Sequence, residues 1–144
     1  MGGIRIVDAE VPFTIFGDDR MIAWITKAHQ KDIRIRMIAG PQIDPKTAML
    51  LCNWIDNKVV EFHYSAMERK GHFIQAGDWA LVEYPHSPFA EKVLALNING
   101  LTPKFREKIE KKFDAIWKVT TPINDSTELD TLIERSIERK KQIS

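Results

Sequence analysis

The sequence predicts an α/β protein in which helices flank a mixed β-sheet, with an extra helix at the C-terminal end. Strand-like segments, in which apolar and polar residues alternate, are interspersed along the chain with segments of helical periodicity. Two helical segments open with pairs that favour a helix start, Asp44-Pro45 and Thr102-Pro103. A Gly77-Asp78 pair between two apolar runs indicates a hairpin. Strands that alternate with helices are typical of parallel β-α-β units, to which a hairpin adds antiparallel strands.

The composition is that of a soluble globular protein of one domain. The chain has 144 residues, of which 44% are hydrophobic and 28% are charged, and its net charge of +1 argues against a dedicated nucleic-acid binder. The one cysteine, Cys52, cannot form a disulfide within the chain, which favours a reducing compartment. No apolar run approaches the ~20 residues that a membrane span needs, and no secretory leader is evident. We therefore expect a cytoplasmic protein without a membrane partner. The abundance of Ile, Lys and Glu is a feature of thermophiles.

Short alternating or aliphatic runs mark the strands. Those outside the hairpin are residues 3–7, 33–39, 59–64 and 92–98, and the last is aliphatic enough to lie inside the sheet. Residues 11–16 are also β-prone, and they either continue the first strand or form a second one. Arg34 and Arg36 share a face, where they serve either as the solvated or ion-paired side of an edge strand or as an anion site.

Apolar periodicity and end signals mark four helices. They run from Asp19 to about Gln30, from Pro45 to about Ile55, from Pro103 to about Trp117, and onward from Asp125. The second has an unusually broad apolar surface, which indicates contact on more than one side, within the domain or at a dimer interface. Thr120-Thr121-Pro122 interrupts the chain before the fourth, which is highly charged. We therefore expect an α/β domain over residues 1–120, and a surface or partner-contacting helix over residues 121–144.

The segment from Glu68 to Ser87 contains two of the four histidines, His72 and His86. It forms the hairpin, with Ala76-Gly77-Asp78 between its two apolar runs. His72 is either an ordinary hairpin histidine, an anion-binding group or a nucleophile. His63 lies in a predicted strand, where we expect it to be buried and hydrogen-bonded.

At this point the order of elements resembles one half of a phospholipase D-like protein. The alternating strand Ile33-Arg34-Ile35-Arg36-Met37-Ile38, the hairpin, the strand over residues 92–98 and the helix ending in Phe113-Asp114-Ala115-Ile116-Trp117 all match that pattern. The resemblance covers about residues 11–118. It implies a phospholipase D-like half-domain. It also implies a homodimer, because such halves pair through the face that carries the hairpin.

The HxKxxxxD signature of that superfamily is degenerate in this chain. In active members, a histidine from each of two signatures attacks or protonates the phosphodiester, the lysines bind phosphate, and the aspartate orients histidine. With His72 as the signature histidine, Ile74 replaces lysine and Trp79 replaces aspartate. Aligning the turns instead puts Lys70 and His72 at the histidine and lysine positions and Gly77 at the aspartate position.

The resemblance therefore implies a non-catalytic domain for dimerisation, ligand sensing or regulation, as in the sensor parts of some archaeal regulators of the TrmB type. The alternative is a divergent phosphodiesterase or nuclease that uses His72 from both chains of a homodimer. Candidate residues for binding a phosphate- or carboxylate-bearing ligand are Lys70, His72, Asp78, His86 and Ser87. We expect no cofactor and no metal, since the chain has no GxGxxG, phosphate-binding loop, HxH or HExxH pattern.

Overall fold

The computed structural model describes residues 3–67, 71–83 and 94–143 and contains a seven-stranded mixed sheet. Its strands lie in the order β6-β5-β4-β1-β2-β3-β7. Their bounds are β1 Ile4–Asp8, β2 Ile35–Ala39, β3 Glu61–Tyr64, β4 His72–Ala76, β5 Trp79–Glu83, β6 Ala95–Ile98 and β7 Thr121–Ile123. The central strands β1, β2 and β3 are parallel, whereas β4, β5, β6 and β7 pair antiparallel with their neighbours. The predicted α/β class and mixed sheet are confirmed.

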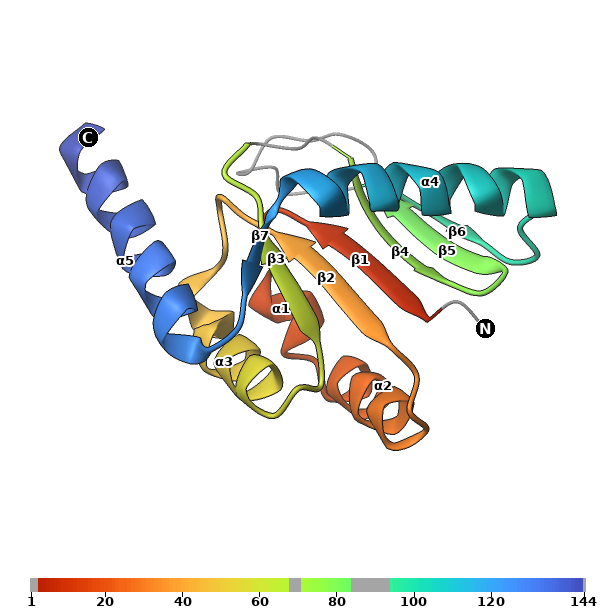
Figure 1. Cartoon of the computed structure of the whole chain (residues 1–144), viewed down its shortest axis with the longest axis horizontal. Helices are drawn as coiled ribbons and strands as arrows, with labels where there is room; N and C mark the ends of the chain where they lie inside the picture. The colour runs from red at the N-terminus through yellow and green to blue at the C-terminus, as the bar shows by residue number, and fades with distance from the viewer. Residues whose placement is uncertain (1–2, 68–70, 84–93, 144) are drawn as a thin grey trace.

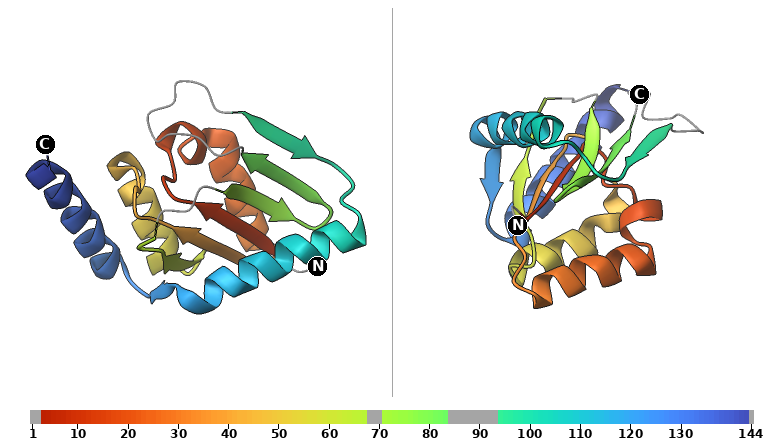
Figure 2. Two further views of the ribbon diagram at one scale, coloured as in Figure 1. Left: turned by 90° about the horizontal axis from the view of Figure 1, so that it is seen from above. Right: turned by 90° about the vertical axis from the view of Figure 1, so that its right-hand side faces the viewer.

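Helices cover both faces of this sheet (Figures 1 and 2). One face carries α1, α2 and α3, and α4 crosses the other. The helix bounds are α1 Phe13–Phe16, α2 Asp19–Gln30, α3 Ala48–Asp56, which follows a short 3₁₀ turn over Pro45–Thr47, α4 Pro103–Val119 and α5 Ser126–Ile143. None of the helices in the described part of the chain is long and apolar enough to span a membrane.

The predicted helix starts are confirmed by side-chain caps. Asp18 accepts a hydrogen bond from the backbone N–H of Arg20 at the start of α2, and Asp44 accepts one from Lys46 before α3. Thr102 caps α4 by accepting from Phe105 N–H. Each cap satisfies a donor that the first helical turn leaves without a partner.

Each face of the sheet packs its own apolar core. The larger core lies under α1, α2 and α3, and it includes Ile6, Met37 and Phe62 from the strands. The smaller core lies under α4 and joins Val7 and Ile38 to Phe113. Because side chains alternate along a strand, β1 and β2 supply residues to both cores.

Two strand predictions are wrong for reasons of packing. Residues 11–16 are not β: Val11 has a φ of 42°, and the short helix α1 follows, with Phe16 fully buried. The 33–39 segment is not an edge, because β2 lies between β1 and β3, although the ion-paired alternative holds for Arg34 with Glu61. Tertiary burial outweighs local propensity in both cases.

The sheet edges also differ from expectation. The described part of the 92–98 segment is the edge strand β6, where Leu96 is 48% exposed, so it does not lie inside the sheet. Aliphatic content alone does not reveal whether another element covers a strand. At the other edge, β7 forms in the interruption before the last helix and pairs with β3. A three-residue strand that contains Pro122 has almost no pattern to detect.

The broad apolar surface of α3 is used within the chain, since α3 packs on the sheet and against α5. Leu129 and Ile133 of α5 join the larger core, while the C-terminal half of that helix projects beyond the sheet (Figures 1 and 2). The four tryptophans also have internal partners: Trp54 is buried in the core, Trp24 meets Trp79 edge to face, and Trp117 stacks on His63. These features therefore do not require a dimer. The division at residue 120 stays a prediction.

Candidate functional site

The hairpin places His72 opposite a glutamate. Strands β4 and β5 join through Gly77 and Asp78, and Gly77 adopts the positive φ of 60° that such a turn favours at its first central residue. In the resulting register, His72 pairs with Glu83. Residues directly opposite each other on antiparallel strands point to the same side of the sheet. The hairpin prediction is confirmed, and it brings an imidazole against a carboxylate.

A second carboxylate comes from the neighbouring strand β1. Val7 of β1 pairs with Phe73 of β4, so Asp8, the last residue of β1, lies beside His72. Asp8 Oδ1 is 3.8 Å from His72 Nδ1, and Glu83 Oε2 is 3.1 Å from the same nitrogen. The side chains of Asp8, His72 and Glu83 are only 9%, 8% and 15% exposed. We call these three residues the acid–histidine cluster.

Two groups of the cluster, His72 and Asp8, have raised pKa values. The hydrogen bond to Glu83 raises the pKa of His72 above its ordinary value of 6.5, against the opposing effect of burial. Burial raises the pKa of Asp8 to about 6, although the charge of His72 partly offsets this. Because an ionised carboxylate only accepts hydrogen bonds, Nδ1 carries the proton of the 3.1 Å hydrogen bond to Glu83.

Asp8 is held in place by the turn that ends β1. Its Oδ1 accepts hydrogen bonds from the backbone N–H groups of Glu10 and Val11, at 3.0 and 3.1 Å. Aspartate often ends a strand in this way, because it offers the backbone a partner outside the sheet ladder. Its other oxygen, Oδ2, accepts no hydrogen bond from any described residue.

The cluster lies at the carboxyl ends of the parallel strands, since Asp8 closes β1. Open α/β sheets bind their ligands at this end. All three residues line a small cavity of about 20 Å³, together with Ile15 and Phe16 of α1. That volume is enough for one water molecule or one ion.

A larger groove lies next to the cluster on the same face. It has a volume of about 600 Å³ and runs between α1, α2 and the hairpin. Its lining is mostly apolar and includes the edge-to-face pair of Trp24 and Trp79, while Asp18 and Arg20 are its charged residues. The volume falls within the range of small-molecule sites.

The predicted site residues do not all meet. Asp78 lies in the turn, at the opposite end of the hairpin from His72, and its carbonyl accepts from Leu101 N–H. The remaining candidates, Lys70, His86 and Ser87, lie outside the described residues. At the signature positions, Ile74 is buried in the larger core, and the Trp79 indole donates to Asn97. His72 is thus the one described member of the predicted set that the structure places with other ionisable groups at short range.

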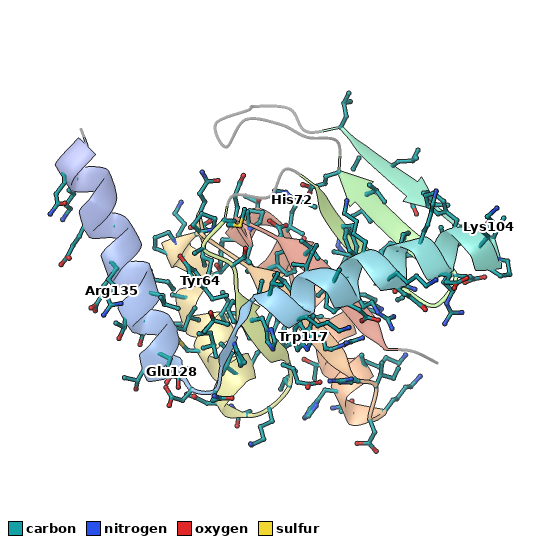
Figure 3. The ribbon with its side chains drawn as sticks, turned by 45° about the horizontal axis from the view of Figure 1, so that its top comes forward. Tyr64, His72, Lys104, Trp117, Glu128 and Arg135 are labelled. Carbon is teal, nitrogen blue, oxygen red and sulfur yellow. The ribbon has the colours of Figure 1, made fainter. Side chains whose placement is uncertain are left out.

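His63 lies on the other face of the sheet, under α4, where its predicted hydrogen bonding is confirmed, although the side chain is half-buried and not buried. Its ring stacks on Trp117 with centroids 3.4 Å apart, and Nδ1 lies 3.1 Å from the Trp117 carbonyl and 3.0 Å from Thr120 Oγ1. The carbonyl can only accept, so Nδ1 carries the proton. Burial lowers the pKa of His63 below 6.5. Figure 3 shows His72 well away from Trp117.

Two buried arginines also lie under α4. Arg5 donates to Gln75 at 2.9 Å and lies 3.6 Å from Glu110, while the Arg36 guanidinium lies over the Phe113 ring at 4.9 Å. These contacts attach α4 to the sheet, so both arginines have structural partners within the chain.

Sequence reasoning missed Asp8 and Glu83. Asp8 directly follows the predicted strand over residues 3–7, and Glu83 lies in the apolar run after the predicted hairpin turn. The available signal was their register: Glu83 lies as far after the Gly77-Asp78 turn as His72 lies before it, which predicts a cross-strand pair. The approach of Asp8 depends on β1 pairing with β4, which no local pattern reveals.

Comparison with known proteins supports the fold. No protein-family model matches the sequence, and no curated protein does. Among solved structures, the chain is similar to TrmBL2, an archaeal chromatin protein, with a TM-score of 0.62 and 10% identity over 84% of this chain and 45% of that one. It is also similar to phosphatidylserine synthase from Haemophilus influenzae, with a TM-score of 0.53 and 13% identity over 99% of this chain and 39% of that one.

The chain therefore spans less than half the length of either similar protein. The similarity to phosphatidylserine synthase is a similarity of fold. Identities this low carry the fold alone.

Proposed function

We propose that this chain is a phospholipase D-like domain that has lost phosphodiester chemistry and acts in ligand sensing or regulation. The observation that carries the proposal is the surroundings of His72. Two carboxylates lie within 3.8 Å of its Nδ1, and the position where the signature lysine would bind phosphate is occupied by the buried Ile74. A phosphodiester is an anion, and nearby carboxylates oppose its approach.

The regulatory role is supported by the neighbouring groove and by one of the similar structures. The groove offers about 600 Å³ of mostly apolar space on the cluster's face, which suits a small ligand. TrmBL2 is described as a chromatin protein with a novel mode of DNA binding, so a similar fold occurs in a DNA-binding protein. In this chain, the domain would bind a small ligand and thereby regulate the proteins with which it is associated.

The test is an assay of the purified protein with bis-p-nitrophenyl phosphate. We expect no turnover above a matched His72→Ala control, since the described site has no phosphate-binding lysine. Turnover that His72→Ala abolishes, while the surface control His29→Ala retains it, would overturn the proposal.

The alternative is a divergent phosphodiesterase, and one observation favours it. Glu83 accepts from His72 Nδ1 at 3.1 Å, which is how a carboxylate orients a nucleophilic histidine. In that case Glu83→Gln would lower turnover together with His72→Ala in the same assay.

We also propose that two copies associate. The apolar side chains of Leu94 and Leu96 at the β6 edge are 73% and 48% exposed, and Phe105 at the start of α4 is 46% exposed. An uncovered edge strand with apolar side chains favours pairing with another chain. Sedimentation equilibrium at micromolar concentration should give a dimer that Leu96→Lys dissociates. A monomeric wild type would contradict this.

A further inference from the structure

We propose that the acid–histidine cluster binds a divalent transition-metal ion, with Asp8, His72 and Glu83 as its three protein ligands. One ligand atom from each residue lies within 4.8 Å of the others. No sequence pattern announces this site, because its residues come from three strands. The inference goes beyond the proposed function, since a bound metal is compatible with either a sensing or a catalytic domain.

The donor set fits such an ion. An imidazole nitrogen with two carboxylate oxygens suits Zn²⁺ and related ions, whereas Mg²⁺ prefers oxygen alone. The two carboxylates carry the negative charge that a divalent cation would offset. A metal would take the place of the proton now at His72 Nδ1, between the same nitrogen and the same oxygens.

The distances fit with small movements. Two ligand atoms that each lie about 2.1 Å from a tetrahedral ion are about 3.4 Å apart. The separations of His72 Nδ1 from the carboxylate oxygens are 3.1 Å for Glu83 and 3.8 Å for Asp8. Shifts of a few tenths of an ångström would therefore bring Glu83 Oε2 and Asp8 Oδ1 to that spacing from Nδ1, and one ligand atom from each of the three residues already lies within 4.8 Å of the others.

Two further observations point to a ligand at this place. The first is the cavity of about 20 Å³ that all three side chains line, which is enough for one ion. The second is Asp8 Oδ2, a carboxylate oxygen on a side chain that is only 9% exposed and that accepts no hydrogen bond from any described residue. Among the described residues, Arg5 Nε is the one fully enclosed side-chain N or O atom without a hydrogen-bond partner, so Asp8 Oδ2 is accessible and can bind an ion.

The test is titration of the untagged wild-type chain with Zn²⁺ by isothermal calorimetry, with thermal unfolding as a second readout. We expect one Zn²⁺ per chain and a Tm that rises with Zn²⁺ concentration, because a ligand that binds only the folded state stabilises it. Mg²⁺ should bind far more weakly. Binding should also weaken between pH of about 8 and pH of about 5.5, because the metal competes with protons for the ligands.

Isosteric variants isolate the ligands. Asp8→Asn keeps an oxygen for the backbone N–H groups of Glu10 and Val11, and Glu83→Gln keeps the shape of β5. Each should weaken Zn²⁺ binding by at least about 100-fold, because even partners behind the first ligands contribute about 10–100-fold. His29→Ala and Cys52→Ala remove other zinc-binding groups and should leave the affinity unchanged.

Several results would overturn the site. They are no heat and no Tm shift at millimolar Zn²⁺, Mg²⁺ binding as tight as Zn²⁺ binding, or Zn²⁺ affinity that Cys52→Ala lowers and Glu83→Gln does not. The wild-type titrations decide the matter even if a variant fails to fold. A chain that binds Zn²⁺ and also hydrolyses bis-p-nitrophenyl phosphate would keep this inference and remove the proposed lack of catalysis.

Discussion

The two described histidines of the sheet, His63 and His72, lie on opposite faces, and their pKa values are shifted in opposite directions. His63 lies under α4 against an indole ring, a carbonyl and a hydroxyl, and burial lowers its pKa. His72 lies on the face covered by α1, against two carboxylates, and its hydrogen bond to Glu83 raises its pKa. The difference comes from the partners: neutral acceptors leave the cost of burying a charge in place, whereas carboxylates more than offset it.

This contrast distinguishes a structural histidine, His63, from a histidine of the candidate functional site, His72. Each polar partner of His63 Nδ1 lies at the C-terminal end of α4, so the ring attaches that helix to β3. The partners of His72 come from two other strands and line a cavity. Ionisable groups with shifted pKa values at a strand end are typical of functional sites, which supports placing the site at His72.

The largest expected effect on the free energy of unfolding concerns the face of the sheet that α4 covers. Phe113→Ala removes a fully buried ring that contacts Phe73 and Trp117 and supports Arg36. We expect a loss of about 3–5 kcal/mol in the free energy of unfolding, measured by urea denaturation, with the His63 environment disrupted. Phe105→Ala, at an exposed position of the same helix, is the matched control and should cost far less. Equal small losses in both variants would mean that α4 does not close this face.

Opposite pH trends should follow from the two histidines. The raised pKa of His72 gives stability that is complete below pH 6.5 and is lost as the pH rises through the folded-state pKa. The lowered pKa of His63 gives stability that is complete above pH 6.5 and is lost as the pH falls through the folded-state pKa. His72→Gln should therefore destabilise the fold most at low pH, and His63→Gln most at high pH. Measurement in an Asp8→Asn background removes the overlapping titration of Asp8. Parallel trends for the two variants would contradict the contrast.

A smaller loss of stability should follow from removing one helix N-cap on each face of the sheet. Asp18→Ala in α2 and Thr102→Ala in α4 each remove a side-chain acceptor of a first-turn N–H. Each should lower the free energy of unfolding in urea denaturation by far less than Phe113→Ala does, without moving either histidine pKa. A change in the pKa of His72 in Asp18→Ala would show that the cluster depends on the position of α2.

Much of the fold could be predicted because its signals are local. Asp18, Asp44 and Thr102 mark helix starts by side-chain capping, and the Gly77-Asp78 turn joins two strands of clear β pattern. The places where prediction failed depend on tertiary contacts. The turn at Val11, the central position of β2 and the edge position of β6 are decided by which elements lie beside them.

The site could be predicted only in part, for the same reason. The hairpin identified His72, but its ionisable partners are one cross-strand neighbour and one residue about sixty positions away in the chain, Asp8. An aspartate at a strand end usually only caps the turn, as Asp8 Oδ1 does here. Its position beside His72 depends on the pairing of β1 with β4.

The most direct test of the account is a nuclear magnetic resonance titration of the imidazole Cε1–H signals, assigned with His63→Gln and His72→Gln. The account predicts a pKa above 6.5 for His72 and below 6.5 for His63, and a His72 pKa that falls in Glu83→Gln. A His72 pKa at or below that of His63, unchanged by Glu83→Gln, would contradict the acid–histidine cluster and every inference built on it.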